Sequence, residues 1–276
     1  MGLDFTEEQI QRYARHILLP QVGGHGQDKL LRSKVLVVGA GGLGSPVLMY
    51  LAAAGVGTLG IVDDDEVDLS NLQRQIVHTT DRVGTAKVES AATALRAINP
   101  DLELILHKER ITASNAETLL SSYDLVTDGS DNFATRFLIN DAAYFTRTPL
   151  VSGAILRFDG QVATFKNFPG GDESGPCYRC IFREPPPPGQ VPSCSEAGVL
   201  GALCGTIGSL QATEILKELL DIGESLSGSL LIYDALATQF RTIKVKRDPG
   251  CPLCGDAPTI TDLSIHESPG EPARHG

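Results

Sequence analysis

Short apolar runs alternate with longer helical segments along the first 152 residues of the chain. The run VLVV is typical of a buried strand, whereas Thr6 and Gln9 form a capping-box pattern that starts a helix. The pattern predicts helices over residues 7–17, 45–54, 86–98, 113–121 and 133–145, and strands over 35–38, 59–62, 102–107, 125–127 and 150–151, with a glycine-rich loop before the first strand. Elements that alternate in this order predict a mostly parallel, doubly wound sheet.

After Ser152 the pattern changes to that of antiparallel strands. In AILRFDGQVATF the pair Asp159 and Gly160 separates two alternating runs, which predicts a hairpin that turns at this pair. A helix over 198–220 and a second pair of strands over 229–233 and 239–245 are expected next. The predicted fold is therefore α/β, with a Rossmann-like parallel sheet extended by antiparallel strands. Residues 258–276 are rich in Pro, Gly, Ser and charge, and are expected to form a disordered tail.

The composition excludes several classes of partner. The formal net charge of the 276 residues is -11, which argues against nucleic acid because binding its backbone requires a face rich in Lys and Arg. Residues 1–20 carry acidic side chains early and resemble neither a signal peptide nor a membrane anchor. No stretch approaches 18 consecutive apolar residues, so no membrane partner is expected and the protein is predicted to be cytoplasmic.

Two CxxC pairs predict a structural metal site. CYRC contains Cys177 and Cys180, and CPLC contains Cys251 and Cys254. A two-residue spacer lets both sulfur atoms of a pair reach one ion, so the four thiolates fit a tetrahedral Zn²⁺ site that leaves no open position for water. Two redox dithiols are the alternative interpretation, but no thioredoxin-like turn surrounds either pair.

The two remaining cysteines differ in their surroundings. Cys204 lies in GALCGTIG at a predicted helix start, where a buried thiol acts as a small apolar side chain. Cys194 lies in the polar segment PSCSEAG, where a thiol could be exposed and reactive.

A glycine turn follows the strand at 35–38. Gly39, Gly41 and Gly44 fit the pattern G-x-G-x-x-G between a strand and an apolar helix, so the helix N-terminus can bind phosphate. Asp63 ends the next strand and could accept hydrogen bonds from a ribose. These residues suit NAD and ATP equally well.

The cations downstream favour ATP. Arg74 lies in DDDEVDLSNLQRQ and Lys87 lies thirteen residues later in VGTAKVES. A triphosphate and a leaving pyrophosphate need converging positive charge, whereas a dehydrogenase does not. The alternative interpretation is that both are solvated surface charges.

The motifs RYARHILLP, GAGGLGS, DDDEVDLSNLQRQ, VGTAKVES and DGSDNFATR, together with the two CxxC pairs, resemble the bacterial MoeB/ThiF family. This family is related to the activating domain of ubiquitin E1 enzymes, and the resemblance extends over residues 6–255. It implies adenylation of the C-terminal glycine of a small β-grasp sulfur-carrier protein by a homodimer with one zinc ion per subunit. It also implies a single E1-like adenylation domain over residues 1–257, with a nucleotide-binding half at about 30–152 and a carrier-binding and zinc half at about 153–257.

The resemblance also implies roles for individual residues. Asp63 would hold the ATP ribose, and Asp131 would coordinate Mg²⁺, with an N-cap to the following helix as an alternative or additional role. Arg15 would reach the active site of the neighbouring subunit. The residues that would contact the phosphates are Asn71, Arg74 and Lys87, and those that would line the nucleotide are Gly39, Gly41, Gly42 and Gly44.

The implied chemistry needs no protein nucleophile. The carrier carboxylate attacks the α-phosphorus in line, and cations and backbone N–H groups stabilise the developing charge. His78 and His107 are therefore interpreted as structural. A covalent role for Cys194 is left open, and a separate sulfurtransferase is expected to supply sulfur.

The carrier could belong to the molybdopterin pathway, which SEAGVLGALCG favours by resemblance, or to the thiamine pathway. An NAD-linked oxidoreductase and a non-catalytic binding module are the alternatives outside this class.

Overall fold

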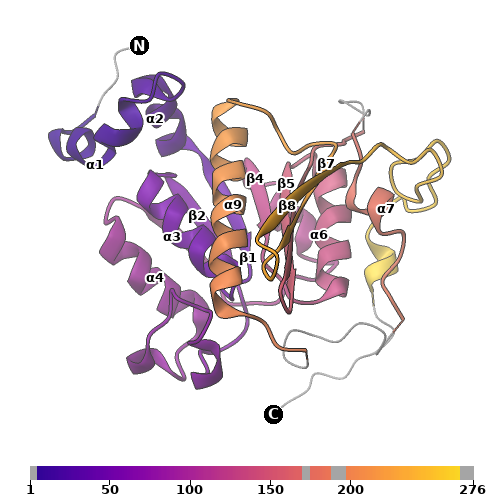
Figure 1. The fold of residues 1–276 in the computed structure, drawn as a ribbon, viewed down its shortest axis with the longest axis horizontal. Coiled ribbons are helices and arrows are strands. Elements are labelled where there is room, and N and C mark those ends of the chain that lie inside the picture. The colour runs from indigo at the N-terminus through magenta and orange to yellow at the C-terminus, as the bar shows by residue number, and fades with distance from the viewer. Residues whose placement is uncertain (1–4, 170–174, 188–196, 268–276) are drawn as a thin grey trace.

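The structure is a computed structural model that describes residues 5–169, 175–187 and 197–267. Its centre is an eight-stranded sheet with the order β3-β2-β1-β4-β5-β6-β7-β8 (Figure 1). The strands are β1 Lys34–Val38, β2 Thr58–Val62, β3 Glu103–His107, β4 Leu125–Asp128, β5 Leu150–Leu156, β6 Asp159–Phe165, β7 Ser229–Asp234 and β8 Gln239–Lys244. The first five pair in parallel and the last three in antiparallel fashion, so the predicted fold class is confirmed.

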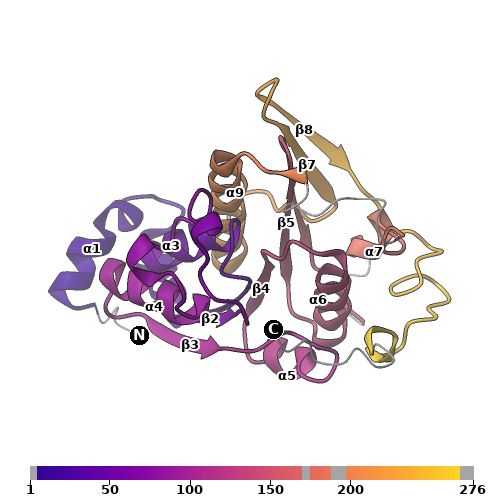
Figure 2. The same cartoon turned by 90° about the horizontal axis from the view of Figure 1, so that it is seen from below.

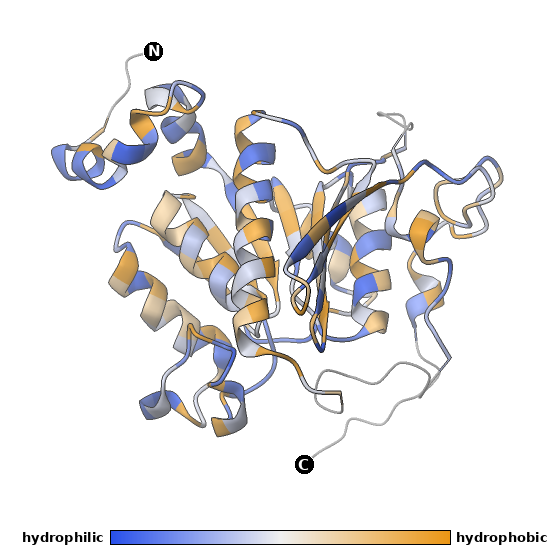
Figure 3. Ribbon diagram, viewed as in Figure 1, coloured by the Kyte–Doolittle hydropathy of each residue, from blue (hydrophilic) through white to orange (hydrophobic). Residues whose placement is uncertain are grey.

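Helices cover both faces of the sheet (Figure 2). Successive side chains of β1 point to opposite faces of the sheet and therefore belong to two hydrophobic clusters. Val35 and Val37 pack with the helices on one face, and Leu36 and Val38 pack with the helices on the other. The first set comprises α3 Gly44–Ala54, α4 Lys87–Ile98 and α9 Gly201–Leu220, and the second comprises α5 Ala116–Leu120, α6 Phe133–Thr146 and the short α7 Tyr178–Ile181. The central strands are hydrophobic along their length (Figure 3), as expected for strands that are buried on both faces.

The expected glycine-rich loop after α1 Glu7–Ile17 is largely helical. Helix α2 runs over Gly23–Arg32, so the loop interpretation was wrong for this segment. The glycines gather at its start, where Gly23 adopts a φ of 58°, and the following residues are good helix formers. Packing also favours the helix, because Leu30 is fully buried and Gln27 donates to the Ala54 carbonyl at 2.9 Å.

The hairpin between β5 and β6 is present, but its turn is not the predicted one. Leu156 pairs with Asp159, so the two-residue turn consists of Arg157 and Phe158, and Arg157 takes the positive φ of 55°. Gly160 instead lies within β6 beneath α9. A Cβ atom at this glycine would approach Ile207 Cδ1 to 2.3 Å, so the glycine serves helix packing rather than the turn.

Other predicted elements agree to within a few residues, although α5 is shorter than expected and α9 begins at Gly201. The segment expected to be a tail packs on the protein as far as residue 267, since Ile260 and Leu263 are buried. Residues 268–276 lie outside the described residues.

Candidate nucleotide site

A cavity of about 230 Å³ opens at the carboxyl ends of β1, β2 and β4. Strand order reverses around β1, which lies between β2 and β4, and open α/β sheets bind their ligands at such a point. Loops that are distant in sequence meet here. The cavity lining includes seven residues predicted from the sequence, namely Gly39, Gly41, Gly42, Asp63, Arg74, Lys87 and Asp131.

The glycine loop packs tightly on the sheet. Gly39 adopts a φ of 95° and donates its N–H to the Val62 carbonyl at 2.8 Å. Gly44 does not line the cavity, but a Cβ atom there would lie 1.8 Å from the Gly39 oxygen. Only glycine therefore lets the first turn of α3 approach the loop so closely. This approach brings the N-terminus of α3 to the cavity, where its free N–H groups favour an anion.

Asp63 is held in place by the backbone on both sides. Its Oδ2 accepts from the Ala40 N–H at 2.8 Å, and its Oδ1 accepts from the Asp65 N–H at 2.9 Å. Burial raises the pKa of Asp63, while the nearby Lys87 and these hydrogen bonds oppose the shift. The carboxylate keeps lone pairs for a further donor, such as a ribose hydroxyl.

The two cations predicted from the sequence both line the cavity and come from different elements. The Lys87 side chain at the start of α4 is only 8% exposed, and its Nζ lies 2.7 Å from Asp65 Oδ2. Arg74 is half-buried and donates through Nη1 to the Ser70 carbonyl at 3.1 Å. Neither side chain is thus a solvated surface charge remote from the glycine loop, which was the alternative interpretation.

Asp131 lies at the exposed mouth of the cavity. The helix that follows is capped by its neighbour, because Asn132 Oδ1 accepts from the Thr135 N–H at 2.9 Å. The N-cap role considered for Asp131 was therefore wrong. Its carboxylate makes no such cap and remains available at the cavity mouth.

Two other predicted residues do not line this cavity, and the position of a third is not described. Asn71 does not line it, and its Oδ1 accepts from the Asp68 N–H at 3.1 Å in a capping box. Arg15 is exposed on α1 and is absent from the cavity lining of this single chain. Cys194 lies outside the described residues.

The sequence interpretation gave no role to several charged residues that line this cavity, namely Asp64, Asp65, Glu109, Arg110 and Arg136. Arg136 of α6 lines the cavity and donates through Nη2 to the Ser130 carbonyl at 2.8 Å. Its Nε lies 3.9 Å from Oδ2 of Asp128, which is 1% exposed. Burial raises the pKa of Asp128, and Arg136 and Ser130 oppose the shift. A signal was available, because Arg136 ends the motif DGSDNFATR and follows Asn132 by about one helical turn.

His78 supports the glycine loop. It is 5% exposed, its Nδ1 lies 2.8 Å from Ser90 Oγ, and its Nε2 lies 2.9 Å from the Ala40 carbonyl. His107 pairs with the Tyr123 hydroxyl at 2.9 Å. Both contacts fit the structural role expected for these side chains.

The buried His78 should make the folding stability pH-dependent. Burial lowers its pKa below the usual value, so the unfolded chain binds more protons as the pH falls. Its contribution is full above about pH 6.5 and is lost as the pH falls toward the folded pKa, with a slope of at most about 1.4 kcal/mol per pH unit. Urea titrations between pH 5 and 8 should show a smaller loss in the neutral His78→Gln variant. Equal slopes in both proteins would contradict this assignment.

The four cysteines of the CxxC pairs form one cluster. The Sγ atom of Cys177 lies 3.9 Å from that of Cys180 and 3.6 Å from that of Cys251, and the Sγ atoms of Cys180 and Cys254 are 3.4 Å apart. Zinc bonds of about 2.3 Å in a tetrahedron give sulfur separations of about 3.8 Å. The arrangement fits the predicted Zn²⁺ site, and the absence of these cysteines from the cavity lining fits a scaffold role.

A second cavity of about 360 Å³ adjoins the first. The two share Asp131, Asn132, Arg136 and Ile155. Its walls are mostly apolar and come from β5, β6, β7 and α7, with Val162, Phe165, Tyr178, Phe182 and Ile232 among them. The two cavities thus form a path from the apolar antiparallel half of the sheet to the glycine loop.

The chain is similar to proteins that activate carrier proteins. The sequence pattern of the ThiF family matches residues 13–253. A sulfur carrier protein adenylyltransferase of Thermus thermophilus is 54% identical over 96% of this chain and 97% of its own. The SAMP-activating enzyme E1 of Haloferax volcanii is 50% identical over 97% of this chain and 98% of its own. A probable adenylyltransferase/sulfurtransferase MoeZ of Mycobacterium tuberculosis is 51% identical over 95% of this chain and 65% of its own.

Among solved structures, MccB of E. coli matches 93% of this chain and 75% of its own with a TM-score of 0.75. The sequence identity is 21%, so this likeness shows a shared fold. Within the described part of the chain, no helix combines the length and apolar character needed to cross a membrane.

Proposed function

Because the chain belongs to the ThiF family, we propose that it is an adenylyltransferase that uses ATP to activate the C-terminal carboxylate of a small β-grasp sulfur-carrier protein. The observation that carries this proposal is the pair of joined cavities. One combines the glycine loop with Arg74 and Lys87, and the other offers an apolar wall for a protein partner.

The arrangement suits in-line attack of a carboxylate on the α-phosphorus of ATP. The reaction forms an acyl-adenylate and releases pyrophosphate, and both reactants are anions. Arg74, Lys87 and the N-terminus of α3 can offset their repulsion and stabilise the leaving group. Asp63 would hold the ribose through its free lone pairs. The carboxylate would enter through the second cavity, because the shared residues Asp131 and Arg136 lie where the two cavities meet.

Two metal ions fit residues of this chain. Asp131 would hold Mg²⁺, which when bound neutralises phosphate charge. Cys177, Cys180, Cys251 and Cys254 would hold Zn²⁺, which when bound ties the α7 turn to the C-terminal segment. The residues that line the nucleotide cavity would bind and orient the substrates, whereas the four-cysteine cluster would act only as a scaffold.

We also propose that the enzyme works as a homodimer in which Arg15 acts at the neighbouring subunit's site. Arg15 is exposed on α1 and lies outside its own chain's cavity lining, so a partner subunit is required for the role that the resemblance implies. The Asn71 Oδ1 accepts from the Asp68 N–H, so Asn71 would contact the phosphates through its Nδ2 group. A covalent role for Cys194 remains a further proposal.

The decisive experiment is ATP–pyrophosphate exchange with individual carriers. We expect exchange only when a carrier with a free Gly-Gly terminus is added, and we expect the molybdopterin-type carrier to act better than the thiamine-type carrier. Intact-mass measurement would detect the acyl-adenylate and any adduct at Cys194. A protein that binds a carrier but leaves ATP intact would be a binding module, and a protein that binds NADH in preference to ATP would refute the proposal.

A further inference from the structure

Helix α6 begins at the nucleotide cavity. Asn132 caps its first turn, and Arg136 in the next turn lines the cavity. The Arg136 guanidinium donates to the Ser130 carbonyl at 2.8 Å, and the Ser130 N–H donates to Asp128 Oδ1 at 2.8 Å. The position of this end of α6 therefore sets the position of side chains at both cavities.

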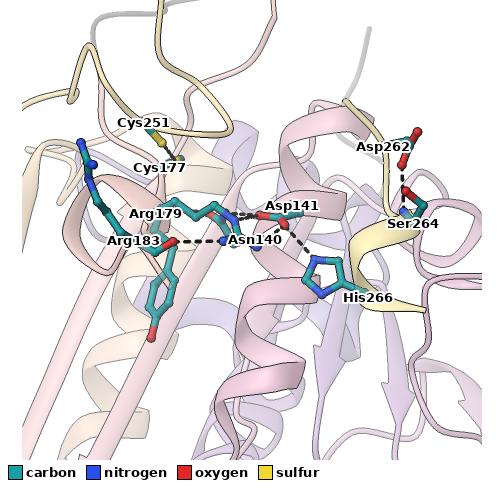
Figure 4. A network of polar contacts seen from close by, with 10 residues as sticks. Asn140, Asp141, Cys177, Arg179, Arg183, Cys251, Asp262, Ser264 and His266 are labelled. Carbon is teal, nitrogen blue, oxygen red and sulfur yellow. Dashed lines mark hydrogen bonds and ion pairs between the residues drawn. The ribbon is translucent and has the colours of Figure 1, made fainter. Parts of the chain in front are cut away.

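Asp141 lies five residues further along α6 and is fully buried. Its Oδ1 accepts from Arg179 Nε at 2.8 Å and from Asn140 Nδ2 at 2.9 Å. Its Oδ2 accepts from Arg179 Nη2 at 2.7 Å and lies 2.8 Å from His266 Nε2 (Figure 4). Four contacts thus fill the lone-pair positions of this carboxylate, which fixes its orientation.

The groups that bind Asp141 come mainly from outside α6. Arg179 lies between Cys177 and Cys180, and His266 lies on the segment that follows Cys254. The neighbouring Asn140 accepts from the Tyr178 N–H at 2.8 Å, inside the same CxxC turn. The four-cysteine cluster and the C-terminal segment are therefore both attached to the middle of α6.

Aromatic packing extends this attachment toward the cavity. The Arg179 guanidinium lies 4.7 Å from the centre of the Phe137 ring, and Phe137 packs edge to face with Tyr178 at 5.1 Å. Phe137 follows Arg136 directly on α6. The contacts of the CxxC turn thus continue to within one residue of a side chain that lines the nucleotide cavity.

We infer that Asp141 is a positioning residue of the adenylation site, acting through α6 to hold Asp131, Asn132 and Arg136 in place against the four-cysteine cluster. A helix transmits the constraint because it is rigid over the distance of about 7.5 Å from Arg136 to Asp141. The inference rests on the proposed function only for its catalytic consequence. The mechanical link between the zinc cluster and the cavity stands independently.

Hydrogen exchange tests the mechanical link without nucleotide or carrier. In the zinc-loaded full chain, Asp141→Asn leaves Arg179 facing an amide donor, and we expect amide exchange over residues 131–139 to quicken at least about five-fold. Removal of zinc from the unaltered protein should quicken the same amides. Arg183→Gln is the matched control, since it removes the exposed ion pair of Arg183 with Asp248 near the same cluster and leaves the groups that bind Asp141 unaltered. Exchange that is unchanged both in Asp141→Asn and after zinc removal would overturn the inference.

The catalytic consequence is tested in the exchange reaction at a temperature where all variants are folded. We expect Asp141→Asn to raise the KM for ATP and lower kcat while its zinc content stays equal to that of Arg183→Gln. A normal KM and kcat with only a lower melting temperature would show that Asp141 merely stabilises the fold and would overturn its positioning role. If Asp141→Asn does not fold, His266→Ala keeps the Arg179 contact and decides the question by the same two measurements. Inactivity of every protein, including the unaltered one, would count against the proposed function and leave the hydrogen-exchange result to decide the link.

Discussion

Replacing Lys87 by methionine should lower carrier-dependent ATP–pyrophosphate exchange by about 10²- to 10³-fold, the loss that follows removal of one preorganised charge-stabilising group. Methionine preserves most of the buried stem, so the change removes mainly the ammonium. Asp63 and Asp65 would then face the triphosphate without the cation that offsets them. Both the affinity for ATP and the stabilisation of the leaving pyrophosphate should fall, so KM should rise and kcat should decrease.

Lys166→Met provides the matched control for this experiment. Lys166 also pairs with a carboxylate, at 2.8 Å from Glu218 Oε2, but it does not line the nucleotide cavity. At a temperature where both proteins are folded, its exchange rate should stay within a factor of about two of the unaltered protein, because Lys166 lies outside the nucleotide cavity. An active Lys87→Met variant would remove the electrostatic basis of the proposed reaction.

Substitution of Asp131 by alanine should reduce exchange by about 10²-fold, the cost of one preorganised electrostatic group in the transition state. The carboxylate lies at the cavity mouth and caps no helix, so its removal should leave the fold intact. If Asp131 holds Mg²⁺, the variant should also require a higher magnesium concentration for half-maximal exchange. The measurement is a magnesium titration of exchange at saturating ATP and carrier.

The control for Asp131 is another exposed aspartate at the opposite edge of the sheet. Asp101 precedes β3, at the amino ends of the parallel strands, and Asp101→Ala should leave both the rate and the magnesium dependence unchanged. An Asp131→Ala variant that loses activity but keeps the original magnesium midpoint would assign the carboxylate to substrate contact instead of metal binding.

The parallel half of the fold could be predicted because local signals and burial agree there. Gly39 and Gly44 follow an apolar strand at the spacing that a close strand-to-helix approach requires, and the structure places them in that approach. Lys87 and Arg74 reach the same cavity because the ends of parallel strands share one edge of the sheet. Their catalytic roles remain predictions.

The features that the sequence did not predict depend on contacts between different elements of the fold. The pair Asp159 and Gly160 has the preferred chemistry of a turn, yet Ile207 of α9 requires Gly160 within the strand. Asp128 and Arg136 stand in one motif, but their sequence spacing does not show that the end of β4 and the first turn of α6 bring the buried carboxylate and the guanidinium to 3.9 Å. A role for Arg15 in a second subunit lies beyond the reach of a single chain's pattern.

The packing of helix α9 determines how cooperatively the chain unfolds. Leu203, Ile207 and Ile215 belong to the same hydrophobic cluster as Val35 of β1 and Val162 of β6, so one core spans the parallel and antiparallel parts of the sheet. Neither part can lose its structure without exposing apolar surface of the other. Thermal melting followed by circular dichroism should therefore show a single transition for the full chain, and a fragment that ends before α9 should fail to fold by itself.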